Sequence, residues 1–243
     1  MSKPSKTKRL LKVIVGIIIF FTLPSLLFFG FVYLKYNEDL PQGETGAKAD
    51  ALAQTMLTAL DESAYLNTDY IEWTFKGMHS YKWYKSTKEC EVSWDQLTVV
   101  LDLEDSTNSK VFVAGQNYDG IEKDLYIKKA TDYFNNDSFW LVAPYKVFDK
   151  GTERRLVKTE AGKDALLVTY TSGGSTPGDS YLWHLNDHGR PKSFQMWVSI
   201  LPIGGVEATW EDWIITESGT QLPTFHKLLF FGIEMSGVKG LNL

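Results

Sequence analysis

The sequence predicts a mainly β (α+β) fold. We expect one strongly curved antiparallel sheet, an unclosed half-barrel, with two helices in its concavity, after a single N-terminal transmembrane helix. Residues 13–34 form an apolar run without a charge. After this run, helical periodicity occurs only in residues 47–65 and 121–135. Short alternating segments separated by turn residues fill most of the remaining chain, which is typical of an antiparallel meander.

The apolar run from Val13 to Leu34 is long enough to cross a membrane as a helix, since each residue adds about 1.5 Å and the hydrocarbon core is about 30 Å thick. Only basic charges precede it: Lys3, Lys6, Lys8, Arg9 and Lys12. The positive-inside rule therefore predicts a cytoplasmic tail at residues 1–12 and an exported domain after the anchor. The run is longer than a signal-peptide core and ends without a small-residue cleavage site, which favours an uncleaved anchor.

Charge differs between the two sides of the anchor. Because residues 1–35 carry +6 of a chain total of −5, the remaining residues carry −11. An acidic domain is a poor nucleic-acid binder, since such binding needs a basic patch. Cys90 is the only cysteine, which excludes an intramolecular disulfide and a multi-cysteine zinc site.

Residues 35–46 are polar and include two glycines and Pro41, so they predict a flexible linker before one domain at residues 47–243. The first helix of that domain, residues 47–65, carries an apolar stripe that needs a surface to pack on. Ile71, Trp73 and Phe75 alternate with polar residues and predict a half-buried strand. Further strands are expected at 81–85, 91–94, 97–103 and 111–114.

A second helix is expected at residues 121–135, and Asp119 with Glu122 resembles a capping box before it. Short apolar or alternating segments return after Asn136. They predict strands at 138–143, 152–159, 165–171, 179–185, 193–201, 206–215 and 222–231.

Two segments resemble known families. The amphipathic helix followed by YIEWTFKG (residues 70–77) and a meander resembles the LolA-like lipoprotein-carrier superfamily. NDSFWLVAPYK (residues 136–146) resembles the FWLxxPxK segment of uncharacterised exported proteins of Bacteroidota-type bacteria, which we connect to the same superfamily. TPGDSYLW (residues 176–183) reinforces that match. The resemblance covers roughly residues 47–235.

The resemblance implies an unclosed barrel whose hollow accepts lipid acyl chains. The ligand-cavity candidates are large apolar residues of the expected sheet: Trp73, Phe75, Leu101, Trp140, Trp183, Met196 and Val198. Lys146 is expected at the cavity rim, where it would meet a lipid headgroup. Ordinary core packing is the alternative for each of them. The chain departs from the carriers in its tether, and none of Arg154, Arg155 and Arg190 matches their functional arginine.

Enzyme signatures are weak, and we expect neither catalysis nor a cofactor or metal. His184 and His188 flank a turn, so their rings need not converge on a metal ion. Asp179 and His184 point to opposite faces of one strand, and Asp179 is expected to accept hydrogen bonds from backbone amides near the 176–178 turn. Gly173-Gly174-Ser175 lacks the flanking pattern of a nucleophile elbow.

Two functions are therefore expected from different classes. The first is a binding module for lipid, acyl chain or lipoprotein, tethered to the bacterial inner membrane through residues 13–34 and facing the periplasm. It predicts an apolar cavity of several hundred Å³. The alternative is a structural or protein-interaction domain of the cell envelope, which predicts a solid core, no cavity and an exposed apolar patch for a protein partner.

Overall fold

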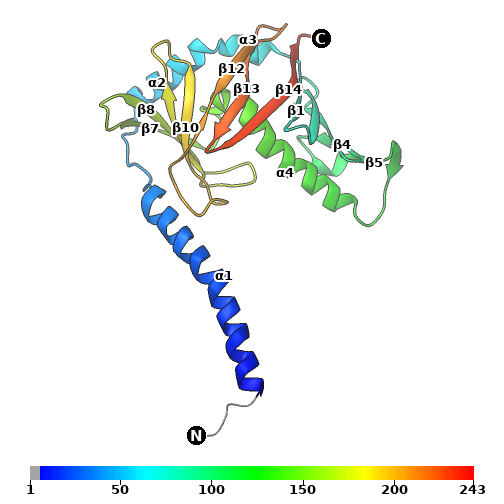
Figure 1. Cartoon of the computed structure of the whole chain (residues 1–243). Helices are drawn as coiled ribbons and strands as arrows, with labels where there is room; N and C mark the ends of the chain where they lie inside the picture. Colours follow the sequence, from blue (N-terminus) through cyan, green and yellow to red (C-terminus); the bar gives the residue numbers. More distant parts are fainter. Residues whose placement is uncertain (1–5) are drawn as a thin grey trace.

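The computed structural model describes residues 6–243, with side chains placed from Leu10 onward, and consists of one long helix leading into a β-rich domain (Figure 1). The domain contains one 14-stranded sheet in which the paired strands are antiparallel. Its end strands are β6 (Gln116–Tyr118) and β7 (Thr152–Lys158), which do not pair with each other. The prediction of a mainly β, unclosed antiparallel sheet with few helices is confirmed.

The N-terminal helix α1 (Lys6–Tyr36) includes a stretch from Leu10 to Tyr36 with a mean hydropathy of 2.5 and no buried residue in its most apolar window. It is long enough and apolar enough to span a membrane. Pro24 lies inside this helix, and the side chains of Thr22 and Ser25 donate hydrogen bonds to carbonyls one turn earlier. Figure 1 shows α1 extending away from the domain rather than packing on it.

The sheet is assembled from two meanders joined through its C-terminal strands. The first meander runs outward from β1 and comprises β1 (Tyr70–Phe75), β2 (His79–Tyr84), β3 (Glu89–Trp94), β4 (Leu97–Asp102), β5 (Lys110–Val113) and β6. The second comprises β7, β8 (Asp164–Tyr170), β9 (Ser180–Leu185), β10 (Pro191–Trp197) and β11 (Val206–Thr209). Strands β13 (Gln221–Leu228) and β14 (Phe231–Leu241) connect β11 to β1, and β12 (Glu211–Ile215) pairs with β13.

Three α-helices and one short 3-10 helix of the domain pack into the main core. They are α2 (Ala47–Ala59), α3 (Glu62–Asn67), α4 (Lys123–Val142) and η2 (Ala143–Lys146), whereas the 3-10 helix η1 (Ser106–Asn108) is exposed. Helix α2 contacts β7 and β8, and α4 contacts β4, β5 and β13. Met56 of α2 and Leu141 of α4 belong to one buried cluster with strand residues such as Trp73, so both helices cover the same face of the sheet.

The strand predicted at residues 138–143 is wrong, because these residues complete α4 and begin η2. The apolar run Phe139–Val142 continues the buried stripe that Ile127, Ala130 and Phe134 begin. The predicted capping box also does not form. Asp119 pairs instead with Lys123 at 2.8 Å.

Two predicted single strands are each split. Residues 206–215 break at Trp210 into β11 and β12. The predicted strand 222–231 instead ends at Leu228, where the chain turns through Leu229 and Phe230 into β14. Leu229 has a φ of 55°, which a leucine rarely adopts. The sequence did not predict this turn because it lacks the glycine or asparagine that usually occupies such a position.

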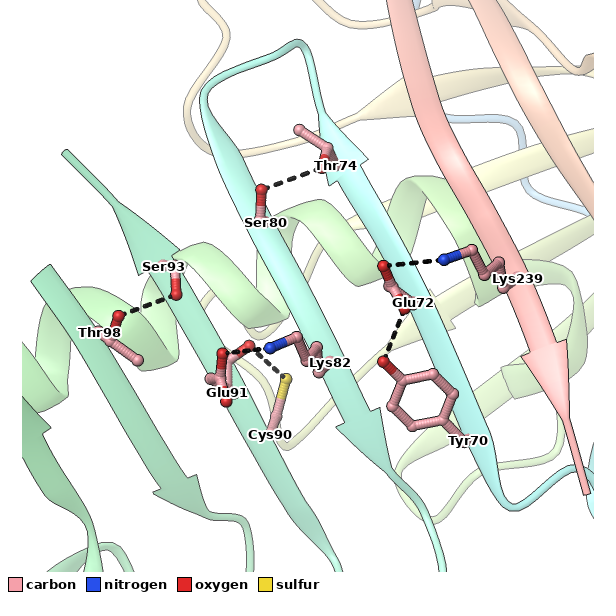
Figure 2. Close-up of polar contacts among 10 residues, drawn as sticks. All are labelled: Tyr70, Glu72, Thr74, Ser80, Lys82, Cys90, Glu91, Ser93, Thr98 and Lys239. Atoms are coloured by element: carbon pink, nitrogen blue, oxygen red, sulfur yellow. Dashed lines mark hydrogen bonds and ion pairs between the residues drawn. The ribbon is translucent and has the colours of Figure 1, made fainter. Parts of the chain in front are cut away.

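The outer face of the first meander is polar. Hydrogen bonds or ion pairs join Thr74 to Ser80, Lys82 to Glu91, and Ser93 to Thr98 across neighbouring strands. Figure 2 shows these pairs on the near face of the sheet, with α4 behind it. The period-2 alternation of these strands therefore separates a polar outer face from the core face.

The linker at residues 35–46 is held against the domain, so the prediction of a flexible spacer is wrong. Asn37 and Glu38 exchange hydrogen bonds with Gly204, through Gly204 N to Asn37 Oδ1 (2.8 Å) and Glu38 N to Gly204 O (3.1 Å). Further along, Glu44 forms a two-way backbone bridge with Leu156 of β7. We call residues 37–44 the strap.

The strap lies beside a second, smaller apolar cluster. Leu167 and Leu182 are register partners whose neighbours Leu166 and Trp183 point into the main core, so this cluster lies on the opposite face. It consists of Val157, Ala165, Leu167 and Leu182, with Trp197 packed against it. Gly43 approaches Val157 so closely that a Cβ there would lie 2.9 Å from the valine side chain.

Candidate functional site: an apolar pocket beside the anchor

The candidate site is a pocket of about 320 Å³ between the C-terminal half of α4 and one end of strands β8, β9 and β10 of the second meander. Three segments of the domain surround it: α4 with η2, the loop joining β8 to β9, and the loop joining β10 to β11. We call it the α4 pocket. Its volume falls in the range of small-molecule sites, which are typically 300–1,000 Å³.

Large apolar and aromatic side chains line most of the pocket. They are Trp83, Phe134, Phe139, Trp140, Tyr170, Tyr181, Met196, Val198 and Ile200. Phe139 lies 4.5 Å from Tyr181 and 5.6 Å from Tyr170 between ring centroids, so one residue of α4 organises an aromatic wall from two strands. Such a lining favours the apolar part of a ligand, because each Å² of apolar surface removed from water contributes about 25 cal/mol.

Polar groups lie at the edges of the pocket. They are Asn135, Asn136, Ser138, Lys146, Asp149, Lys150, residues 172–176 and Asp179. Lys146 forms an ion pair with Asp149 at 3.2 Å, and both side chains remain partly exposed. An apolar hollow with a charged edge suits an amphiphile, whose head stays near water while its chain is buried.

Hydrogen bonds fix the two loops that flank the pocket. Asp179 is nearly buried, and its Oδ1 accepts a hydrogen bond of 2.9 Å from the backbone N of Ser199 in the β10–β11 loop. Ser175 accepts a hydrogen bond from Asn135 of α4 (3.0 Å) and contacts Asp132 at 3.1 Å. The predicted role of Asp179 as an acceptor for a backbone amide is confirmed, although its donor comes from the next loop.

Tyr170 places a polar atom without a partner in the pocket wall. Its hydroxyl is buried and has no hydrogen-bond partner among residues 6–243. Burial raises the pKa of the phenol well above its usual value, with a smaller contribution from Tyr181, so the group stays a neutral donor. A buried donor left unpaired costs free energy, and a ligand oxygen that accepted a hydrogen bond from the hydroxyl would remove that cost.

A buried polar cluster positions α4 over the sheet. Asp137 is almost fully buried and accepts hydrogen bonds from Tyr81 Oη (2.5 Å) and Asn136 Nδ2 (2.8 Å), and it lies 2.7 Å from His79 Nδ1. The His79 ring stacks on Tyr133 with centroids 3.8 Å apart. Burial followed by the Asp137 charge raises the pKa of Tyr81 far above its usual value, which keeps the phenol protonated as a donor. The cluster thus holds the middle of α4 against β2.

The structure divides the sequence-predicted site residues into two groups. Trp140, Met196, Val198 and the rim residue Lys146 line the α4 pocket together. The other four are packed in the core: Trp73, Phe75, Leu101 and Trp183. Trp73 stacks on Tyr81 at 4.3 Å, and Trp183 lies 5.1 Å from Phe194, so these positions are filled by neighbouring rings.

Sequence reasoning missed Trp83, Phe134, Phe139, Tyr170, Tyr181 and Ile200 as lining residues. The signal that could have found Phe139 was its place in residues 136–146, of which Asn136, Ser138, Phe139, Trp140 and Lys146 all line the pocket. Reading residues 138–143 as a strand concealed this, because a strand would have pointed Phe139 and Trp140 to opposite faces.

The pocket lies close to the C-terminal end of α1. Val198 and Ile200 line it from the β10–β11 loop, and Gly204 of the same loop hydrogen-bonds to Asn37 and Glu38, directly after α1 ends at Tyr36. Trp197 Nε1 also donates to the Glu38 carbonyl at 2.8 Å. Figure 1 shows this end of the domain above the C-terminal end of α1.

The histidines and arginines weighed in the sequence take other positions. His184 contacts Gln195 at 3.2 Å, while His188 is exposed in the following turn. Arg154 pairs with Asp50 at 2.6 Å and Arg190 donates to Gln221 at 2.8 Å, so both connect elements of the fold. Within the described part of the chain, no three His, Cys, Asp or Glu side chains gather as a metal site would require.

Comparisons with protein-family models and with curated proteins gave no match. Among solved structures, the chain is similar to the crystal structure of a DUF1329 family protein from Desulfovibrio piger ATCC 29098. The TM-score is 0.40 at 10% sequence identity, over 79% of this chain and 92% of that chain. A similarity at this level does not indicate a function.

Proposed function

We propose that this chain is a membrane-anchored binding protein that holds the apolar part of an amphiphile in the α4 pocket. The ligand class is a lipid or a lipoprotein acyl chain. The observation that carries the proposal is the joint position of the pocket and the anchor: one loop, β10–β11, both lines the pocket and hydrogen-bonds to the residues that follow α1. An amphiphile that leaves the bilayer therefore has a short path to an apolar hollow.

The chemistry of the lining supports this ligand class. Six of the lining residues carry large aromatic rings, and Met196, Val198 and Ile200 add non-aromatic apolar surface. Lys146 at the edge can meet an anionic headgroup. The unpartnered hydroxyl of Tyr170 can donate to an ester or carboxyl oxygen next to the acyl chain. The resemblance of residues 70–77 to LolA-like carriers agrees with this interpretation, as does that of residues 136–146 to uncharacterised exported proteins that we connect to the same superfamily.

The proposed orientation places the tail at residues 1–12 in the cytoplasm and the domain in the periplasm, because only basic residues precede the apolar run. In this arrangement the protein works at the inner membrane as a binding module rather than as an enzyme. The pocket favours this function over the alternative of a structural domain, since that alternative predicts a solid core.

The test is photo-crosslinking on the full chain in phosphatidylcholine nanodiscs, with a palmitate analogue that carries a diazirine in mid-chain. Mass spectrometry then locates the modified peptides. We expect modification around Phe139 and Met196 that unlabelled palmitate competes away. Val198→Asp should abolish it, because a charge in an apolar pocket is costly. Tyr170→Phe should weaken the competition by palmitate by about two- to tenfold, as loss of one hydrogen bond implies.

The matched control is Ile215→Asp, which places the same charge on an exposed isoleucine outside the pocket. Circular dichroism confirms that each variant is folded. Modification confined to α1, or equal labelling of the domain in the Val198→Asp and Ile215→Asp variants, would contradict the proposal.

A further inference from the structure

A second apolar surface lies at the turn between β13 and β14 and reaches the α4 pocket through Ile200, which also lines that pocket. Leu229, Phe230 and Phe231 are consecutive and exposed, with Phe230 at 81% exposure. Ile200, in the β10–β11 loop, is 71% exposed. We call these four residues the apolar tip. Exposed aromatic and aliphatic residues gathered on loops usually mark an interaction surface.

The register of the sheet brings the two parts of the tip to the same end. Ala208 of β11 pairs with Leu228 of β13, and continuing this antiparallel register by two residues brings Phe230 level with Val206. Val206 directly follows the β10–β11 loop that carries Ile200. The tip is therefore formed by two loops at the same end of neighbouring strands of the sheet.

The same end of these strands contacts the residues that follow α1. Gly205, next to Val206, lies so close to Glu38 that a Cβ on the glycine would be 2.7 Å from the Glu38 Cβ. Glu38 is the second residue after α1. The contact between Glu38 and Gly205 thus holds this end of the strands beside the C-terminal end of α1. A bilayer crossed by α1 would therefore lie next to the apolar tip.

The turn has exposed apolar residues where its backbone conformation favours glycine, asparagine or aspartate. A two-residue hairpin turn that starts at positive φ normally takes glycine, asparagine or aspartate. Here the first turn residue is Leu229 at φ 55°, followed by Phe230. Such strain at an exposed position is commonly associated with function.

We propose that the apolar tip inserts into the interface of the bilayer that α1 crosses. Charged neighbours of the tip include Glu38, Glu207, Lys227 and Glu234, which do not form a basic patch. The insertion is therefore driven by apolar burial, does not require anionic lipids, and is insensitive to salt. It gives the domain a second membrane contact and turns the mouth of the α4 pocket toward the lipid.

The experiment uses the full chain in phosphatidylcholine nanodiscs with an environment-sensitive fluorophore on a single introduced cysteine. Cys90 is buried and stays unlabelled under native conditions. Phe230→Cys reports on the tip, Ile200→Cys tests it from the other loop, and Ile215→Cys is the control. Ile215 is exposed too, but it pairs with Gln221 at the opposite end of β13.

We expect a blue-shifted emission at positions 230 and 200 that nitroxide-labelled lipids quench, and neither effect at position 215. Adding Phe231→Asp to the Ile200→Cys protein should reverse the blue shift, and salt should not. Equal lipid quenching at the tip and at position 215 would overturn the proposal. A blue shift without lipid quenching would also overturn it, since a protein contact would then cover the tip. Position 230 is not among the residues that line the α4 pocket, so its readout does not depend on whether the pocket binds an acyl chain; position 200 lines the pocket, so its result counts only together with that at position 230.

Discussion

The indole Nε1 of Trp197 donates a hydrogen bond of 2.8 Å to the backbone carbonyl of Glu38, and this contact joins the sheet to the segment that follows the anchor. A Cβ on Gly204 would lie 2.3 Å from the indole Cδ1, so the ring fits tightly between the strap and the loop. Trp197 is therefore central to how the domain is held against the segment that follows α1.

Trp197→Phe should release the strap while leaving the core intact. The phenylalanine keeps an aromatic ring but has no donor for the Glu38 carbonyl, which costs about 1 kcal/mol of local stability. Hydrogen exchange of the full chain should become faster in residues 37–44 and stay unchanged in β1–β4. Trp213→Phe is the control, because its indole donates to Trp210 away from the strap. Equal exchange in both variants would contradict the role of Trp197.

Asp137→Ala should destabilise the domain by about 3 kcal/mol, because Tyr81 and His79 lose a buried acceptor together. Asp137→Asn should cost less, since the amide oxygen still accepts from Tyr81. Urea unfolding followed by near-ultraviolet circular dichroism measures both values. Asp187→Ala, at an exposed position, is the control. A loss in Asp137→Ala no larger than in this control would show that the cluster does not hold α4.

His226 should make stability depend on pH. Its ring is fully buried next to Trp140 and Trp210, and burial lowers the pKa to about 4. The folded state therefore binds fewer protons than the unfolded state between about pH 4 and the usual histidine pKa of about 6.5. Its contribution is complete above about pH 6.5 and is lost as the pH falls toward 4, by about 3 kcal/mol in total.

The measurement is urea unfolding of the full chain at a series of pH values from 4 to 7. His226→Asn retains a donor for the Thr209 carbonyl, which lies 2.8 Å from His226 Nδ1, but does not titrate. The variant should show a shallower slope than the parent in this window. His188→Asn, at an exposed turn, should keep the parent slope. If the unfolding free energy of the His226 variant depended on pH as steeply as that of the parent, His226 would not be the source of the pH dependence.

The fold was predictable where neighbouring residues alone showed the spacing of apolar side chains. Ile71, Trp73 and Phe75 alternate with polar residues, and they form β1 as predicted. The end of α4 was not predictable, because Asp137 and Ser138 interrupt its apolar stripe. Besides its neighbour Asn136, the partners of the buried Asp137 are His79 and Tyr81, which lie more than 50 residues away. A short apolar run such as Phe139–Val142 does not by itself distinguish a strand from a buried helix.

The site was predictable only in part for the same reason. Met196 lies in β10 and Val198 directly after it, in a segment whose alternation was evident from the sequence, and both line the pocket. Trp73 and Trp183 share that kind of pattern but face rings from other elements, which fill the space beside them. Whether an inward aromatic residue packs or borders a hollow depends on residues distant in sequence.

Tyr170→Phe should leave the stability of the ligand-free domain unchanged or raise it by about 1 kcal/mol, because it removes a buried hydroxyl that has no partner among the described residues. Tyr145→Phe should do the opposite. Its hydroxyl donates to the carbonyls of Leu60 and Gln221, at 3.1 and 2.7 Å. Thermal unfolding of the two variants side by side measures the difference. Similar losses in both would indicate that Tyr170 has a partner.

Asp179→Ala should loosen the pocket without unfolding the domain. The Asp179 carboxylate joins the β8–β9 strand connection to Ser199 in the β10–β11 loop. Hydrogen exchange should rise in residues 171–178 and 198–205, and photo-crosslinking of the palmitate analogue should fall. Asp164→Ala, at an exposed residue of β8, is the control. Unchanged exchange in both loops would show that this contact does not hold the pocket.

The strap also determines how far the domain can travel. Eight unattached residues could extend about 26 Å and would let the domain move by that distance relative to α1. Because the strap instead lies along β7 and the β10–β11 loop, that reach is not used. In the proposed membrane arrangement, the domain would move with the lipid around α1, in two dimensions and at nearly constant height. A cargo held in its pocket would then have to be collected by a partner that comes to it.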